Sequence, residues 1–478
     1  MKNFVIFVLS LIILVGGAAA AYPLYTNYVE DQIANWVTVE NARHPDATFS
    51  YQTLEARPLT SEIIIHGLSF DTKDETTTIQ RAEVTVDSFL LLTRVNSVKQ
   101  AQFLNISSIS KTETITTSAG IITLSNLTGN LTDFAFSTPD DIDIFNQVSA
   151  DTLLMEAVTL KDTEEGIDIP IAQIQLSDIH NGMIGETALR DLSIAVDGAT
   201  VTIGEILLNG LNAGETMKLT QRMEQDERWE PSARDVIKAL HLQRIEVSDL
   251  IATPDGQPQM GLGGFTISDI VYSDGIPTAL TATYDNLNTP ITDDIRRDLL
   301  NSVGSQIHVD LPDNVISKGS FSYALDTQQD RLSLLNSSYD SWLETQIDVE
   351  FDIRNVVSVF NALKEDQTPN ENDTMRVEIG GMSIRAENKT PWEAPKILDG
   401  KPTLRLFLVN ILQSFNLSPN WDAAIGQPLQ KFLNQGGVLE ISTNPTRRLT
   451  LLEFMFMHSA TPEQIVDSIG FSATHNPN

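Results

Sequence analysis

The sequence predicts a β-rich α+β fold: an elongated antiparallel β-sheet body with helical inserts, an N-terminal transmembrane helix and a helix-rich C-terminal module. Three observations lead to this prediction. Short runs of alternating apolar and polar residues, rich in β-branched side chains, follow one another over most of the chain. An uncharged apolar run opens the sequence. Apolar residues at helical spacing return in a few inserts and towards the C-terminus.

Residues 1–25 are predicted to form a cytoplasmic stub and a membrane anchor. Lys2 precedes an uncharged apolar run from Phe4 to Ala21, and these 18 residues approach the ~20 that a membrane-spanning helix needs. A cleaved signal peptide is the alternative, because Ala18 to Ala21 offers an Ala-x-Ala cleavage site. The position of Lys2 before the run directs the remaining chain out of the cytoplasm. We therefore expect a single-pass inner-membrane protein whose bulk is periplasmic.

Composition limits the class of protein. The chain of 478 residues has no cysteine, which excludes disulfides, zinc–thiolate sites, iron–sulfur clusters and cysteine nucleophiles. Because a secreted eukaryotic chain of this length usually carries disulfides, a bacterial origin is favoured. Acidic residues outnumber basic ones 64 to 31, for a net charge of -33. Such a chain repels phosphate backbones, so we expect no nucleic-acid partner.

The first elements after the anchor are a helix and a series of strands. Residues 26–46 are predicted to form a juxtamembrane helix, since Val29, Ile33 and Trp36 follow helical spacing and Pro45 ends it. Residues 47–212 are predicted to form a first β-rich region. Its strands are expected at Ile63–Phe70, Ala82–Phe89, Ala119–Phe136, Ile169–Ile179, Leu189–Val196 and Thr200–Leu211.

The second half repeats this organisation after an interruption. Residues 213–242 are predicted to form a helical insert and a subdomain boundary, with Pro231 splitting two helices and Ser232 as N-cap of the second. Residues 243–390 are predicted to form a second β-rich region with helix candidates at 292–303 and 356–364. Residues 391–478 are predicted to form the helix-rich C-terminal module, with helices at Leu404–Phe415, Gly426–Gly437 and Thr461–Phe471 around a strand at Gly437–Ser442.

One hexapeptide pattern recurs along the chain, and eight copies illustrate it: an apolar residue, any residue and a second apolar residue are followed by a polar or glycine pair and a final apolar residue. The pattern predicts a strand that faces a core, ended or kinked by its polar pair, because Ser, Asp, Asn and Gly tolerate turn and bulge geometry. Ser248, Asp249, Ser268 and Asp269 are thus interpreted as structural. A shared metal-ligand role would require an acidic residue in every copy. The copies begin at Ile63, Val84, Ile122, Ile174, Ile206, Ile245, Phe265 and Val377.

The layout resembles a known class of envelope protein. One span, a juxtamembrane helix and the segment Ser50–Leu91 are together similar to bacterial AsmA-like proteins and to the similarly laid-out YdgA-like family. Ile425–Phe454 resembles the end segment of uncharacterised proteobacterial envelope proteins. The resemblance implies a long, curved sheet and a membrane-anchored periplasmic β-groove associated with phospholipid movement or outer-membrane homeostasis. It carries no catalytic motif.

A search for chemistry leaves no candidate site, so we predict no catalytic, cofactor-binding or metal-binding residue and no enzyme activity. No histidine pair has His-x-x-x-His spacing. Ser108–Lys111 has Ser-x-x-Lys spacing but lies among β-type residues, and Gly261–Phe265 precedes a strand instead of opening a helix. The acidic segments Pro139–Phe145 and Lys161–Ile169 lack the EF-hand spacing for calcium. A carboxylate pair joined only by folding stays open.

Three functions remain. The leading one is a membrane-anchored periplasmic envelope protein that handles lipid in an apolar β-groove or supports outer-membrane homeostasis, with the inner membrane bound through residues 4–21 and phospholipid or another envelope protein as partner. The alternative is a periplasmic scaffold that binds another protein through a strand edge or the C-terminal module. There, Arg447–His458 could lie on a membrane surface, although a core segment is favoured. The remote alternative is an unrecognised hydrolase.

Overall fold

The computed structural model describes residues 31–477 with gaps. The gaps are at 32–33, 36, 39–40, 43–46, 58–59, 87–96, 113, 130–147, 165, 197, 226–230, 304–311, 343, 365–368, 389–396, 399–400, 403–421, 444–447, 451 and 454–468. The predicted transmembrane run at 4–21 lies outside the described residues. Among the residues that are described, no helix is long and apolar enough to span a membrane. The described positions between 31 and 42 are helical, as expected for the predicted juxtamembrane helix.

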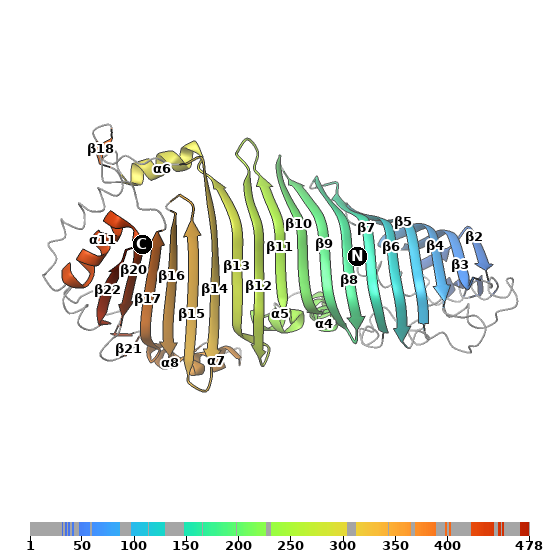
Figure 1. Ribbon diagram of the computed structural model, residues 1–478. Coiled ribbons are helices and arrows are strands. Elements are labelled where there is room, and N and C mark those ends of the chain that lie inside the picture. Colours follow the sequence, from blue (N-terminus) through green and yellow to red (C-terminus); the bar gives the residue numbers. More distant parts are fainter. Residues whose placement is uncertain are drawn as a thin grey trace. The chain divides into compact units, whose positions relative to one another are not determined.

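The chain divides into two compact units, Met1–Asp255 and Gly256–Asn478, called unit 1 and unit 2. In each unit antiparallel strands pair into a sheet, with few helices, as Figure 1 shows. The predicted β-rich antiparallel fold is therefore confirmed. The division after Asp255 follows the helical insert at which the sequence had placed a boundary.

The sheet of unit 1 is a meander. From β3 to β11 each strand pairs antiparallel with the next. Two short strands, β1 and β2, pair with successive parts of β3 and together form the edge. The strands are β1 Ala47–Ser50, β2 Thr53–Arg57, β3 Glu62–Thr72, β4 Glu75–Val86, β5 Ser97–Ser110, β6 Ile115–Gly129, β7 Val148–Asp162, β8 Ile167–His180, β9 Met183–Val196, β10 Ala199–Asn212 and β11 Arg244–Thr253.

Two helices, α4 (Ala213–Gln225) and α5 (Ala233–Leu240), connect β10 to β11 in the predicted helical insert. Ser232 is the N-cap of α5, as predicted: its hydroxyl accepts from the Asp235 backbone N–H at 3.2 Å, and the Asp235 carboxylate accepts from the Ser232 backbone N–H at 3.1 Å. The Thr216 hydroxyl of α4 donates to the Ala239 carbonyl of α5 at 3.2 Å. The insert thus forms a small helical pair at one end of the strands (Figure 1).

Unit 2 repeats the meander. From β12 to β17 each strand pairs antiparallel with the next, and β20 and β21 pair with successive parts of β17. The last strand, β22, pairs with β20, while β18 pairs only with β19. The strands are β12 Met260–Ser273, β13 Ile276–Pro290, β14 Asn314–Asp326, β15 Arg331–Asp340, β16 Thr345–Arg354, β17 Glu378–Asn388, β18 Ile397–Leu398, β19 Lys401–Pro402, β20 Gly437–Thr443, β21 Leu449–Thr450 and β22 Phe471–Asn476.

The helices of unit 2 lie between these strands. Both helix candidates of the second β-rich region are present, as α6 (Asp293–Val303) and α7 (Val357–Lys364). A short helix, α8 (Glu371–Met375), precedes β17. Near the C-terminus a π-helical turn, η2 (Asp422–Gly426), leads into α11 (Gln427–Gln435).

The helix-rich module predicted for residues 391–478 is not shown in the described part, where the predicted helix at Gly426–Gly437 is present as α11 and the predicted strand at Gly437–Ser442 as β20. Strands β20, β21 and β22 instead extend the sheet of unit 2, and α11 packs against β20 and β22 with Phe432 and Leu433 buried (Figure 1). The physical reason is the edge of β17, whose unpaired backbone groups are satisfied when another strand adds to it. Of the other predicted helices, 404–415 lies outside the described residues and 461–471 is described only from 469.

The polar pair of the repeated hexapeptide kinks its strand and does not end it. In six of the eight copies the fifth residue has a positive φ, between 52° and 80°, and the strand continues beyond it. Gly, Asn and Asp adopt this left-handed region at the lowest cost, which explains their selection. The copy at Val84 runs into undescribed residues, and the copy at Val377 coincides with a register shift. The six residues are Gly67, Asn126, Asp178, Gly210, Asp249 and Asp269.

At two of the positions with positive φ, a glycine on the neighbouring strand leaves room for the side chain of the kinked residue. Asp249 of β11 lies opposite Gly204 of β10, and Asn286 of β13 lies opposite Gly263 of β12. A Cβ on either glycine would lie 2.9 Å from the Cβ of its partner, a distance that real Cβ atoms do not reach. This accounts for the Gly261–Phe265 motif, which lies inside β12 and, as predicted, opens no helix.

The kinks change which side chains face the core. On β5 the buried residues are Ala101 and Phe103, then Ile106 and Ser108, so two successive residues point outward at Asn105, where φ is 51°. The pairing register with β6 is the same on both sides of the kink. Strict alternation would turn the second half of the strand to the opposite face. The slip therefore keeps buried side chains on one face on both sides of the kink, and the outward pair is Leu104 and Asn105.

Candidate functional site: the apolar sheet faces

Register places the apolar residues of unit 1 in rows that run across the strands. In each row every residue lies directly opposite the next, with one residue from each strand between β2 and β11. One face of this sheet is therefore apolar over its width. The first row is Leu54, Ile65, Ala82, Phe103, Ile122, Met155, Ile174, Leu189, Ile206 and Val247. The second row is Ala56, Ile63, Val84, Ala101, Leu124, Leu153, Leu176, Thr187, Leu208 and Ile245.

Burial of this face changes along the rows. From β3 to β7 most row residues are at most 8% exposed, with Phe103 at 0% and Leu153 at 8%. They belong to one hydrophobic core cluster. From β8 to β11 the residues of the first row are only partly buried. We call β2–β7 the closed stretch and β8–β11 the half-open stretch of the apolar face.

Thr187 is the one polar residue in these two rows. It lies on β9 in the half-open stretch, directly opposite Leu176 of β8 and Leu208 of β10. Its side chain is buried, with 6% exposure. Its hydroxyl has no hydrogen-bond partner among the described residues.

The opposite face of unit 1 is polar. Arg190 of β9 donates to the Glu205 carboxylate at 2.8 Å and to the Gln173 side-chain carbonyl at 2.6 Å. These three residues are paired across β8, β9 and β10 by register. The two faces of the sheet thus differ in character, as they do when only one of them meets a core or an apolar partner.

Unit 2 has an apolar face with the same row pattern, but its large apolar side chains are at most partly buried. Among the described residues of β12–β17, no aliphatic or aromatic side chain of a leucine, isoleucine, valine, methionine, phenylalanine or tyrosine is buried. Phe321 is 40% and Ile347 is 39% exposed. One row is Leu280, Tyr323, Leu334, Phe351 and Met382, and the next is Ile267, Ala282, Phe321, Asn336, Val349, Ile384 and Ile441.

The polar face of unit 2 has ion pairs. Asp352 of β16 accepts from Arg331 at 2.8 Å and from Arg354 at 3.4 Å. Arg385 of β17 pairs with Glu387 at 2.7 Å. Since these groups are partly exposed, the pairs contribute little to stability, and their main effect is to keep this face hydrated.

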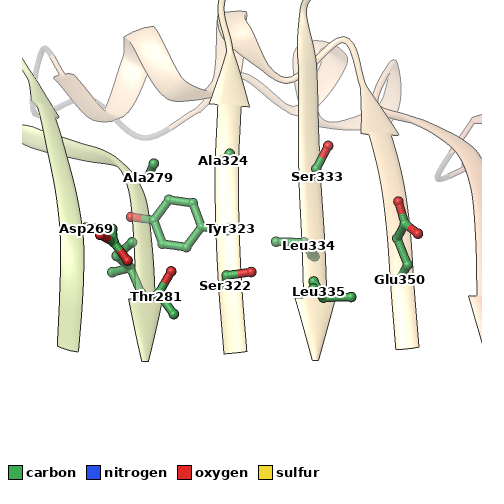
Figure 2. A pocket seen from close by; sticks show the side chains of 11 residues that line it. Asp269, Ala279, Thr281, Ser322, Tyr323, Ala324, Ser333, Leu334, Leu335 and Glu350 are labelled. Atoms are coloured by element: carbon green, nitrogen blue, oxygen red, sulfur yellow. The ribbon is translucent and has the colours of Figure 1, made fainter. Parts of the chain in front are cut away.

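A hollow of about 440 Å³ lies on this polar face (Figure 2). Its lining follows two neighbouring rows, in which small side chains leave the space. Seven of its residues share this face by register, whereas Leu280, Tyr323 and Leu334 alternate with them and point to the apolar side. The seven are Ala279, Thr281, Ser322, Ala324, Ser333, Leu335 and Glu350.

The charged groups of the hollow are both acidic. Asp269, at its left-handed kink, accepts from the Ser268 hydroxyl at 3.0 Å, and Glu350 lies on β16. The Tyr323 hydroxyl donates to the Pro277 carbonyl at 3.1 Å, and burial raises the pKa of Tyr323 above its usual value. The two carboxylates come from strands at opposite sides of the hollow, so they do not converge on one reacting atom.

The segments considered for chemistry are held in structural contacts. Ser108 is buried, and its hydroxyl lies 3.0 Å from that of Thr77 and also bonds Glu75. Lys111 instead pairs with Asp71 at 2.7 Å and, by this hydrogen bond, lowers the pKa of that carboxyl. The Ser-x-x-Lys spacing therefore does not create a nucleophile and base.

The acidic and histidine side chains that the structure describes are not brought together in a shared site. Lys161 pairs with Asp168 at 3.0 Å across the β7–β8 turn, while Pro139–Phe145 lies outside the described residues. In the described part of the chain, no three His, Asp or Glu side chains are grouped so that they could hold a metal ion. Ser248 and Asp249 lie inside β11, and Ser268 and Asp269 inside β12, in structural roles.

A family model matches the C-terminal segment of the chain. Residues 403–476 match a family model described as an uncharacterized protein. This match includes α11, β20, β21 and β22, the elements that extend the sheet of unit 2. No curated protein matches the chain.

Proposed function

We propose that the chain is a membrane-anchored periplasmic envelope protein that shields the acyl chains of lipids on its apolar sheet faces. The observation that supports this most is the face of β12–β17, on which large apolar side chains lie in rows and stay partly exposed, with Phe321 and Ile347 about 40% exposed. Contact of such a surface with water is unfavourable, since each Å² of apolar area removed from water lowers the free energy by about 25 cal/mol. Contiguous exposed apolar area of this kind is typical of a binding surface.

An acyl chain fits the chemistry of this face. The rows offer alkyl and aromatic groups with few hydrogen-bonding side chains, so they would hold a ligand by its hydrocarbon area alone. Each row runs across the strands and takes one residue from each. An acyl chain lying along a row would therefore contact side chains from several strands. The polar face behind them, with its Arg331 and Arg385 ion pairs, would stay in water. Residues 4–21 would fix this surface beside the membrane that supplies the lipid.

The proposal is tested by lipid analysis of the full-length chain purified from membranes. Mass spectrometry of the extract is expected to show phospholipid at a stoichiometric level. Phe321→Glu and Ile347→Glu place a carboxylate on the apolar face and should lower the bound lipid several-fold. Leu335→Glu is the matched control, because Leu335 is 46% exposed but lies on the opposite face by register. Repeated absence of lipid from the unmodified chain would contradict the proposal, as would equal losses in all three variants.

A periplasmic scaffold is the second candidate. It is supported by the exposed side chain of Leu335 beside the hollow of the polar face, where a protein side chain could insert. In this case Leu335→Glu would release a co-purifying protein, and Phe321→Glu would retain it. The same three variants thus separate the two candidates.

A further inference from the structure

The hollow on the polar face of unit 2 is elongated across the strands. Its seven face residues come from two neighbouring rows, which lie two residues, or about 7 Å, apart along each strand. Small side chains leave the space, since Ala279 lies opposite Ala324 in one row and Thr281 lies opposite Ser322 in the other. A long space of this width fits an unbranched chain better than a branched or ringed molecule.

The lining of the hollow combines alkyl groups with hydroxyls. The methyl groups of Ala279 and Ala324 and the exposed side chain of Leu335 offer contact with hydrocarbon. Thr281 and Ser322 add hydroxyl oxygens, which can accept a hydrogen bond from an N–H group. A ligand that matches this lining has methylene groups along its length and N–H donors.

Each end of the hollow has a carboxylate. Register places Glu350 of β16 in the same row as Ser268 of β12, and Asp269 is the next residue on β12. Four strand spacings, or about 19 Å, therefore separate the two ends. Figure 2 shows Asp269 and Glu350 at opposite sides of the hollow. Since no basic residue lines the hollow, its electrostatic potential favours a cation at both ends.

The two carboxylates lack a counter-charge in the part of the chain that the structure describes. Glu350 lies two residues from Asp352 on the same face of β16, and Asp352 pairs with Arg331 at 2.8 Å and with Arg354 at 3.4 Å. Glu350 and Asp269 form no ion pair with any described residue. A cationic ligand would supply the positive charges that this face provides to Asp352 but not to them.

We propose that the hollow binds a linear polyamine or long-chain diamine, with one terminal ammonium beside Asp269 and the other beside Glu350. The methylene groups between the two ends lie over Ala324 and Leu335, and inner amines donate to the hydroxyls of the lining. An exposed carboxylate binds a single ammonium weakly, so the affinity depends on engaging both ends at once. This inference does not rest on lipid handling, because the hollow lies on the opposite face of the sheet.

Two diamines of equal charge and different length test the span of the hollow. The probes are dodecamethylenediamine, with twelve carbons between its ammonium groups, and putrescine, with four. Each is titrated calorimetrically into the full-length chain in a nonionic detergent at physiological ionic strength. The unmodified chain is expected to bind the long diamine about tenfold more tightly, since putrescine cannot reach both carboxylates. Equal affinities would overturn the proposal, because a merely acidic surface responds to charge and not to length.

Glu350→Gln removes the carboxylate at one end. It should weaken binding of the long diamine about threefold to fivefold, which is the effect of one exposed ion pair. Asp285→Asn is the matched control. Asp285 is an exposed carboxylate without an ion pair among the described residues, and it lies on the same face of β13 by alternation from Ala282, outside the hollow. This variant should keep the affinity of the unmodified chain, and equal losses in both variants would contradict the proposed site.

Ala324→Leu fills the hollow without changing any charge. It should remove the preference for the long diamine and leave binding of putrescine unchanged. Because Ala324 is only partly buried, the thermal unfolding midpoint of this variant should match that of the unmodified chain, which separates lost binding from lost folding. A long-diamine preference that survives in Ala324→Leu would place the ligand elsewhere and overturn the proposal.

Discussion

The closed stretch of unit 1 and the β12–β17 sheet of unit 2 have the same row pattern but different exposure. In the closed stretch, side chains such as Phe103 and Ile65 are at most 1% exposed and pack into one core cluster. In β12–β17, Phe321 lies in such a row and Ile347 lies two residues from Val349 on the same face, and both remain about 40% exposed. The comparison teaches that a row of apolar side chains is not by itself a core. Stability resides in the first region, and the second has surface available for a partner.

The largest difference between the two regions is expected when a phenylalanine is truncated in each of them. Phe103→Ala is expected to lower the free energy of unfolding by about 3–5 kcal/mol, because it leaves a cavity in a packed core. Phe321→Ala is expected to lower it by less than ~1 kcal/mol, since a partly exposed side chain loses little burial. Denaturant unfolding of the two variants measures both values. A loss for Phe321→Ala as large as that for Phe103→Ala would mean that the face of unit 2 is covered.

The second largest effect on stability is expected at the glycines that face the kinks. Both units place a glycine opposite a left-handed residue, Gly204 in unit 1 and Gly263 in unit 2. Gly263→Ala should destabilise by about 1–3 kcal/mol, since the added Cβ meets the Asn286 side chain. Gly264→Ala, one residue along the same strand, has nothing within 4 Å and should be neutral or stabilise by up to about 1 kcal/mol. Thermal unfolding compares the two.

A second substitution controls this prediction. Asn286→Gly removes the side chain that the new Cβ would meet and keeps a residue that adopts positive φ. In the Gly263→Ala background it should recover part of the lost stability. Failure to recover any would show that the close approach of these two residues is not the cause.

The smallest expected effect is the pH dependence of unit 2. Burial raises the pKa of Tyr323, so the folded chain keeps the phenolic proton to higher pH than the unfolded chain. Above about pH 10, where an unfolded tyrosine ionises, the folded state therefore binds more protons, and the free energy of unfolding falls as pH rises. Tyr323→Phe should weaken this fall. The free energy of unfolding of the unmodified chain and of Tyr323→Phe, measured between pH 8 and pH 11, checks this prediction. Identical slopes of this free energy against pH would contradict it.

Much of the strand pattern could be predicted from the sequence, since alternation and β-branched residues mark most strands of both units. The repeated hexapeptide was recognised, but whether its polar pair ended or kinked the strand could not be decided. That choice depends on the conformation of one residue, such as Asp249, and on the glycine facing it from another strand. The kinks at Asn105 and Ala157 were missed because their preceding residues, Leu104 and Glu156, do not fit the pattern.

The candidate site could be predicted only as a type of surface. The sequence predicted an apolar groove. How exposed this surface is depends on what packs over each row, and the sequence of a single strand does not determine that packing. The apolar surroundings of Thr187 could not be predicted, because threonine is common in strands. They follow only from the pairing that places Leu176 and Leu208 opposite it. For residues 391–478, the helix at Gly426–Gly437 and the strand at Gly437–Ser442 could be predicted and are present as α11 and β20, whereas β21 and β22 were not predicted, because their pairing with β17 and β20 depends on strands distant in the sequence.

In unit 1 the slip of side-chain alternation at the kinks also makes the sheet extensible. Because the pairing register there is unchanged across the kinks, a hairpin that carries the same pair of outward residues can add to this meander without disturbing any existing pair. In unit 2 the register shifts at the kinks at Asp269 and Asn286. Each added strand would lengthen every row by one residue. The width of the apolar face then depends on how many hairpins the gene encodes. Duplication or loss of a hairpin would change the apolar area of this face and leave the chemistry of its surface constant.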